Sequence, residues 1–185
     1  MKTYTKTLLF TFILFVLGVN ASKAQSDFYT NLEWDPIRLG VVIPESNSEY
    51  KGGLSFGTEL RYNLSNDISI GMGLNYIANS TDKEATKIGL SGSYVVVGDY
   101  YLRNNSITRA FVGFGFGYKI EGDYTLKTNS GSEKKKGVTG EILTPRVGYE
   151  FGHIRLMASY DLGFKKELTN SFSLSLAFTL GGGRK

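Results

Sequence analysis

Apolar residues recur at every second position along most of the chain after Gln25, which is the side-chain period of a β-strand. In residues 172–180, Phe172 and each second residue after it are apolar, whereas serine, alanine and threonine fill the positions between them. The same alternation occurs in seven further segments: 32–43, 54–64, 68–76, 87–101, 112–120, 141–151 and 154–164. An even set of eight such segments predicts an all-β fold, an eight-stranded antiparallel up-and-down transmembrane β-barrel.

Short and long connections alternate between these segments. The short ones are expected at 65–66, 103–107 and 152–153, and the long ones at 44–51, 78–86, 121–139 and 165–171. Transmembrane barrels have this asymmetry, with short periplasmic turns and long outer loops. Within segment 141–151, Pro145 lacks the N–H that a strand ladder uses, so we expect a local bulge there.

The composition of the two strand faces indicates which face meets lipid. One face carries leucine, isoleucine, valine and phenylalanine, and the other is dominated by glycine, serine, alanine and threonine. Small residues fit the narrow interior of an eight-stranded barrel, whereas an apolar outer band suits hydrocarbon. Aromatic residues are expected near both ends of that band, as at membrane interfaces: Trp34, Tyr62, Tyr100, Tyr149 and Phe151 at the short-turn end, and Tyr76, Tyr118 and Phe164 at the long-loop end.

The first 24 residues have the layout of a secretory signal. Lys2 and Lys6 precede an apolar run of about 12 residues, and a small-x-small sequence at 22–24 follows it. A membrane-spanning helix needs about 20 apolar residues, so an uncleaved anchor is the less favoured alternative. We therefore expect a cleaved signal peptide at 1–24, a short lead-in at 25–31, the barrel at 32–181 and a tail at 182–185.

With these features the chain resembles the small eight-stranded outer-membrane barrels, the OmpA/OmpX-like "outer membrane protein beta-barrel" family. The resemblance covers the signal and residues 32–181, and it implies a location in a bacterial outer membrane. It also implies insertion by the outer-membrane assembly machinery. Members commonly end the last strand on an aromatic residue that resembles the assembly signal, whereas here residues 181–185 follow that strand. The signal would then be internal.

Charged residues on the inward face form the main candidate site. They are Glu59, Arg61, Asp99, Arg146, Glu150, Arg155 and Asp161. An interior of this size is just wide enough to be filled by side chains, and charges enclosed there must pair to offset their desolvation. We interpret these residues as a polar network that fills the lumen. A narrow solute path is the alternative, and a paired catalytic set is less favoured.

The longest connection carries a second candidate, the basic residues Lys127, Lys134, Lys135 and Lys136. Its composition is that of a mobile, solvated loop. The functional alternative is a basic surface patch that contacts anionic lipopolysaccharide or a partner.

The sequence shows little sign of a catalytic, nucleotide-binding or metal-binding site. The chain has no cysteine and one histidine, His153, which is expected in a short turn on the periplasmic side. Lipid A deacylases of this barrel class need a serine and a histidine at the outer end, so that resemblance does not extend to their activity. The glycines of 113–117 lie in a strand and not in the strand-turn-helix context of a nucleotide loop. No cofactor or metal is expected.

The net charge argues against a nucleic-acid-binding protein. The formal charge is +4, but the signal peptide holds three lysines, and the remainder has 18 basic and 17 acidic residues. Such a chain is a poor binder of nucleic acid. We therefore predict a non-enzymatic outer-membrane barrel with a structural or surface-interaction role through its outer loops. A narrow porin-like channel and a soluble secreted barrel that binds an apolar ligand stay open as alternatives.

Overall fold

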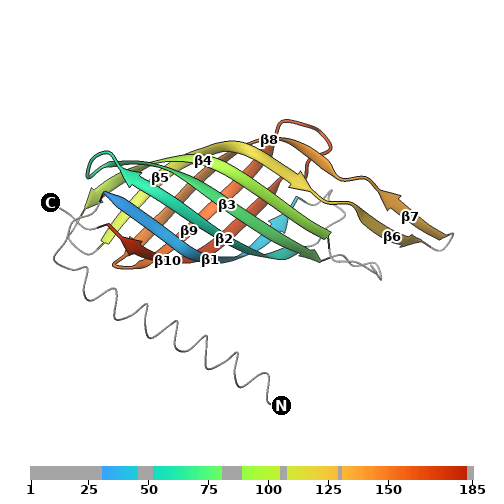
Figure 1. The fold of residues 1–185 in the computed structure, drawn as a ribbon, viewed down its shortest axis with the longest axis horizontal. Coiled ribbons are helices and arrows are strands. Elements are labelled where there is room, and N and C mark those ends of the chain that lie inside the picture. Colours follow the sequence, from blue (N-terminus) through green and yellow to red (C-terminus); the bar gives the residue numbers. More distant parts are fainter. Residues whose placement is uncertain (1–30, 46–51, 81–88, 105–107, 129–130, 183–185) are drawn as a thin grey trace, which may run out of the picture.

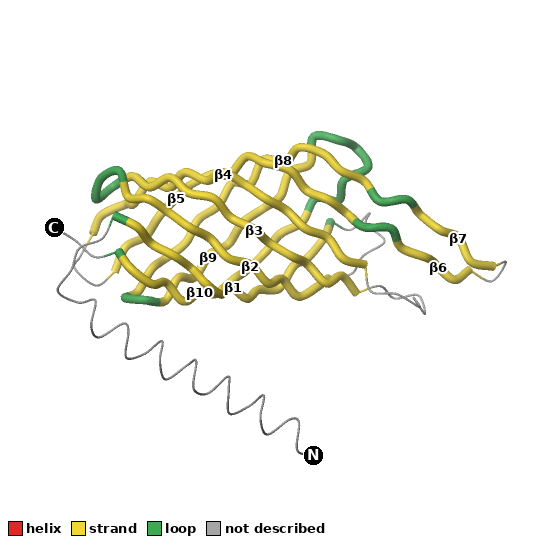
Figure 2. The backbone as a smooth tube through the Cα atoms, viewed as in Figure 1, coloured by secondary structure: helices red, strands yellow, loops and turns green. Residues whose placement is uncertain are grey.

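The computed structural model describes residues 31–45, 52–80, 89–104, 108–128 and 131–182, which form strands, turns and loops (Figures 1 and 2). The barrel strands are β1 (Leu32–Pro44), β2 (Gly52–Asn63), β3 (Ile68–Ser80), β4 (Gly89–Asn104), β5 (Thr108–Glu121), β8 (Val138–Phe151), β9 (Ile154–Gly163) and β10 (Ser171–Gly181). Two shorter strands, β6 (Tyr124–Thr128) and β7 (Gly131–Lys135), lie between β5 and β8. Among the described residues, no helix has the length and apolar character of a membrane span.

The eight barrel strands close on themselves. Each barrel strand pairs antiparallel with the barrel strands that precede and follow it in the chain, so that β5 pairs with β8, and β1 completes the circle by pairing with β10. Because closure leaves no strand edge unpaired, every barrel strand has a hydrogen-bonding partner on both sides. The predicted fold class, an all-β, eight-stranded antiparallel up-and-down barrel, is confirmed.

The barrel has a polar interior and an apolar exterior. Along β10 the serines at 171, 173 and 175 are buried, whereas Phe172, Leu174 and Leu176 are exposed. The same arrangement holds around the barrel, where Arg61 and Arg155 are among the largest fully buried side chains. All eight aromatic residues expected at the two ends of the apolar band are exposed. Alternation therefore separates the two environments as the sequence predicts.

A β-bulge lies at Pro36 in β1, not at Pro145. The pairing of β1 with both β2 and β10 shifts by one residue across Asp35 and Pro36. By contrast, the ladder between β8 and β9 omits Thr144 and Pro145 but resumes in the same register. The expected bulge at Pro145 is therefore wrong: the missing N–H interrupts the ladder without adding a residue to the strand.

The longest connection is not simply an irregular loop. Strands β6 and β7 form a two-stranded ribbon with Tyr124 opposite Lys135, and the ribbon projects beyond the barrel (Figure 1). It continues the wall made by β5 and β8, and the Gly137 N–H donates to Asp123 Oδ1 at 2.7 Å where the ribbon joins the barrel. The polar composition of this segment concealed a hairpin, because β-pairing depends on register as well as on hydrophobicity.

Candidate functional site: the charged lumen

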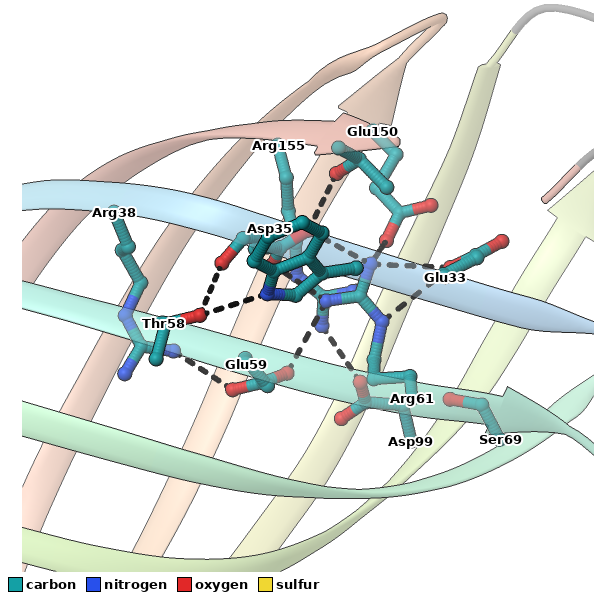
Figure 3. A network of polar contacts seen from close by, with 12 residues as sticks. Glu33, Asp35, Arg38, Thr58, Glu59, Arg61, Ser69, Asp99, Glu150 and Arg155 are labelled. Atoms are coloured by element: carbon teal, nitrogen blue, oxygen red, sulfur yellow. Dashed lines mark hydrogen bonds and ion pairs between the residues drawn. The ribbon is translucent and has the colours of Figure 1, made fainter. Parts of the chain in front are cut away.

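A cluster of arginines and carboxylates crosses the lumen (Figure 3). Most of its members come from the parts of the strands nearest the short turns, and this end of the barrel is here called the short-turn end. We call this cluster the lumen network. Its members are Glu33, Asp35, Arg38, Glu59, Arg61, Asp99, Arg109, Arg146, Glu150 and Arg155. Five are cationic and five are anionic, so the cluster is neutral. Neutrality is what burial of so many charges requires.

Arg61 joins the first two strands inside the barrel. Its Nη1 lies 2.6 Å from Asp35 Oδ2 and 3.2 Å from Glu59 Oε1, and its Nη2 lies 3.1 Å from Glu33 Oε2. The side chain is fully buried. A planar guanidinium can serve several carboxylates at once because its five N–H donors point in fixed directions. Figure 3 shows Arg61 among these acidic side chains.

Arg146 connects opposite parts of the wall. From β8 it donates two bonds of 2.7 Å to Asp99 on β4, and its Nη1 lies 2.8 Å from Glu59 on β2. Arg155 adds a 2.6 Å contact to Asp99 and an ion pair with Glu150. Bidentate contacts of this kind fix side chains in one geometry. The network therefore braces the barrel across its interior.

Aromatic rings complete the filling of this end. Tyr101, Phe111 and Met157 form a buried apolar cluster, and the two rings lie 5.9 Å apart. The Arg109 guanidinium lies 4.0 Å from the centre of the Tyr101 ring, and that of Arg155 lies 3.8 Å from Phe111. Such stacking is favourable for both partners. Together with the ion pairs, it leaves this part of the lumen occupied by side chains.

Six of the seven predicted lumen residues belong to the network: Glu59, Arg61, Asp99, Arg146, Glu150 and Arg155. The seventh, Asp161, is also buried but lies nearer the end of the barrel with the long connections, here called the long-loop end. There its Oδ1 accepts a 2.9 Å hydrogen bond from Thr144.

Sequence reasoning missed Glu33, Asp35, Arg38 and Arg109. The bulge at Pro36 explains the first two, because simple alternation gives Glu33 and Asp35 the same face as the outward Ile37. Pro36 was the one feature of the sequence that could have indicated this bulge. Arg38 does lie on the predicted inward face of its strand, while Arg109 precedes the segment expected to form β5.

The long-loop end has its own polar contacts. Lys119 pairs with Glu121 at 3.3 Å and donates to the Thr169 carbonyl at 2.7 Å, and Glu121 accepts from the Thr169 N–H at 3.1 Å. Leu168 of the same connection is buried. These contacts hold residues 164–170 against the barrel mouth. Of the predicted basic patch, Lys136 is exposed; the backbone places Lys127 in β6 and Lys134 and Lys135 in β7, but their side chains lie outside the description.

His153 and the strand glycines have structural surroundings. His153 occupies the turn between β8 and β9, where its Nδ1 lies 2.9 Å from the Thr179 carbonyl. Gly113 faces the lumen, and a Cβ there would overlap the Asp99 carboxylate and the Gly98 carbonyl. The glycine thus makes room for the network. In the described part of the chain, no group of three or more histidine, cysteine or acidic residues is placed to hold a metal ion.

Each carboxylate of the network contacts at least one arginine. The network contains no histidine, serine or cysteine. Its chemistry is charge pairing.

Comparisons with known proteins support the fold. No family model matches the chain, and no curated protein matches it. Among solved structures, the N-terminal barrel domain of Pseudomonas aeruginosa OprF is 14% identical, with a TM-score of 0.51 over 82% of this chain and 98% of that one. Neisserial surface protein A is 12% identical, with a TM-score of 0.55 over 82% and 97%. The outer membrane enzyme PagL is 15% identical, with a TM-score of 0.48 over 78% and 98%.

At these identities the likeness concerns the fold. The chain has the fold of the small eight-stranded outer-membrane β-barrels, and the resemblance expected from the sequence is confirmed at that level. The segments expected to be a signal peptide and most of a lead-in, residues 1–30, lie outside the described part, as do residues 183–185.

Proposed function

We propose that this chain is an integral barrel of a bacterial outer membrane that is exported by its signal peptide, is closed to solutes, and acts through its long-loop end. The observation that carries the proposal is the reversal of polarity between wall and lumen. Large apolar side chains are exposed on every barrel strand, including Leu54 at 69% and Met72 at 67%, while arginines and carboxylates are buried inside. In water such an exterior would associate or aggregate, whereas lipid solvates it.

Strand length agrees with a membrane location. The barrel strands contain 10 to 16 residues each. A tilted strand needs about 9–11 residues to cross the hydrocarbon core. The described strands are therefore long enough to span a bilayer, and the longer ones extend past it.

The filled lumen favours a closed barrel over a pore. Arg61 and Arg146 lie in the path of any solute, and each is held by carboxylates from more than one strand. The same interior argues against a pocket for an apolar ligand, because such a ligand would have to displace paired charges. We also propose that the chain is not an enzyme, since the network lacks a nucleophile or a free base.

The outer surface offers a site of interaction. The ribbon of β6 and β7 extends beyond the wall, and the segment around it contains Lys127, Lys134, Lys135 and Lys136. Clustered lysines attract anionic groups, so we propose that this end contacts lipopolysaccharide phosphates. We also propose that the outer-membrane assembly machinery recognises the last strand, β10, when the barrel is inserted.

Heat-modifiability in the outer-membrane fraction tests the central proposal. A boiled and an unboiled sample should migrate differently on a denaturing gel, because a closed barrel resists detergent until it is heated. Planar-bilayer recording of the purified protein should show no steady conductance. A protein found only in the soluble fraction, with no mobility difference, would overturn the membrane assignment; steady channels would instead favour the narrow pore.

A further inference from the structure

A second polar region lies in the lumen between the network and the barrel mouth. It is a cavity of about 40 Å³ with Arg38, Glu59 and Arg146 among the residues at its network side. The other polar residues that line it include Ser55, Asn75, Ser93, Thr144, Asp161 and Ser173. One water-sized sphere occupies roughly 10–15 Å³, so the cavity accommodates an ion or a few waters but not a sugar or a nucleotide.

Asp161 differs from the other carboxylates of the lumen. It is only 7% exposed, and its described hydrogen bond comes from the neutral hydroxyl of Thr144. Among the residues that the structure describes, no lysine or arginine lies within ion-pair distance of Asp161, whereas every other buried carboxylate has such a partner. A buried carboxylate without a counter-charge is strongly destabilising unless something neutralises it.

The neighbouring cations are already engaged. Arg38 and Arg146 share Glu59, as Figure 3 shows for Arg38. Lys119 donates weakly to Ser171, which lies opposite Asp161 in the ladder, but its ion pair is with Glu121. The described lumen holds six cationic side chains and seven carboxylates: Arg38, Arg61, Arg109, Lys119, Arg146 and Arg155 against Glu33, Asp35, Glu59, Asp99, Glu121, Glu150 and Asp161. The described lumen therefore holds one carboxylate more than it holds cations. Asp161, the carboxylate without a described ion pair, lines the cavity together with Arg38, Glu59 and Arg146.

We propose that this cavity binds a monovalent inorganic cation such as Na⁺, with the Asp161 carboxylate as its charged ligand. Hydroxyl, amide and carboxylate oxygens are the donors that hard cations prefer. A single carboxylate is too little charge for a tight Ca²⁺ site, which takes 6–8 oxygens and usually several acidic ligands. The ion would neutralise the lumen. It would also connect β8, β9 and β10 through Thr144, Asp161 and Ser173, nearer the long-loop end than the arginines of the lumen network.

Unfolding of the purified protein in detergent micelles tests the proposal. The unfolding midpoint is measured in NaCl and in choline chloride at equal ionic strength, at neutral pH. The wild-type protein should be more stable in NaCl, with a response that saturates as Na⁺ rises, because a ligand that binds only the folded state stabilises it. Asp161→Asn should lose this difference and should be at least as stable as the wild type in choline chloride.

Two further variants serve as a control and as a test of a second ligand. Glu167→Gln removes a carboxylate from an exposed position at the same end of the barrel, so it should retain the full Na⁺ response. Thr144→Val keeps the lumen charge but removes a neutral oxygen, so it should weaken the response and shift saturation to higher Na⁺. Equal midpoints of the wild type in the two salts, or an unchanged Na⁺ response in Asp161→Asn, would overturn the cation site.

Discussion

Replacing Arg61 by methionine should show how much the ion pairs of the lumen network contribute to the stability of the barrel. Arg61 is the only described cationic partner of Asp35, whereas Glu33 keeps Arg109 and Glu59 keeps two arginines. The substitution therefore leaves one buried carboxylate, Asp35, with only the hydroxyl of Thr179 as a described side-chain partner. Removing one partner of a buried ion pair costs about 3–5 kcal/mol. We expect the Arg61→Met variant to lose about that much stability.

Urea unfolding followed by tryptophan fluorescence provides the assay. Trp34 is the only tryptophan in the sequence, and it reports on the outer wall next to the network, where its Nε1 donates to Thr58 at 3.0 Å. With a denaturant dependence of about 2 kcal/mol per molar urea, the midpoint should fall by about 2 M. The exposed Lys166→Met variant loses a cation without touching the lumen and should leave the midpoint nearly unchanged.

A double substitution tests whether uncompensated charge is the cause. Asp35→Asn combined with Arg61→Met removes both charges and keeps an oxygen that can accept from Thr179. The double variant should recover about 2 kcal/mol relative to Arg61→Met, since the buried carboxylate is gone. The reasoning is refuted if Arg61→Met stays within about 1 kcal/mol of the wild type, or if the double variant is less stable than the single one.

Three further predictions concern separate parts of the barrel. Gly113→Val should displace the Asp99 carboxylate and cost about 1–3 kcal/mol in the same unfolding assay, whereas Gly98→Ala, with its nearest neighbour 4.0 Å away, should be close to neutral. Leu168→Ala should release residues 164–170, seen as faster hydrogen exchange at the Thr169 amide; unchanged exchange would contradict the described contacts. Glutamine at all four lysines of the basic patch should reduce binding to lipopolysaccharide micelles at low salt and not at high salt, and equal binding at low salt would remove the patch from the proposed function.

The faces of the barrel were predictable because alternation is a local property. A residue in β10 and its second neighbour point to the same side whatever the rest of the chain does, so Ser173 and Leu174 could be assigned from sequence alone. The burial of Arg155 and Asp161 followed from the same rule. These assignments needed only the correct strand boundaries.

The partners inside the lumen could not be predicted in this way. Arg146 contacts Glu59 across 87 positions of sequence, and this pairing depends on how the closed barrel brings β8 opposite β2. The ribbon of β6 and β7 was missed for a related reason, because its strands are short and polar and their pairing shows only when the register is known. Asp161 was predicted to lie in the lumen, where it is buried, but its separation from the ion-paired cluster could not be predicted, since sequence gives a residue's face without its height in the lumen.

The bulge at Pro36 also changes the alternation of β1 partway along the strand. Before the bulge, Leu32 and Trp34 point outward at even positions; after it, the outward residues fall at odd positions from Ile37 onward. A regular strand through the same residues, without the bulge, would force one half to turn over. Either the acidic side chains of the first half would move onto the apolar exterior, or the apolar side chains of the second half would move into the lumen. The bulge therefore keeps both halves of the strand, which alternate in opposite phase along the sequence, in the same closed wall.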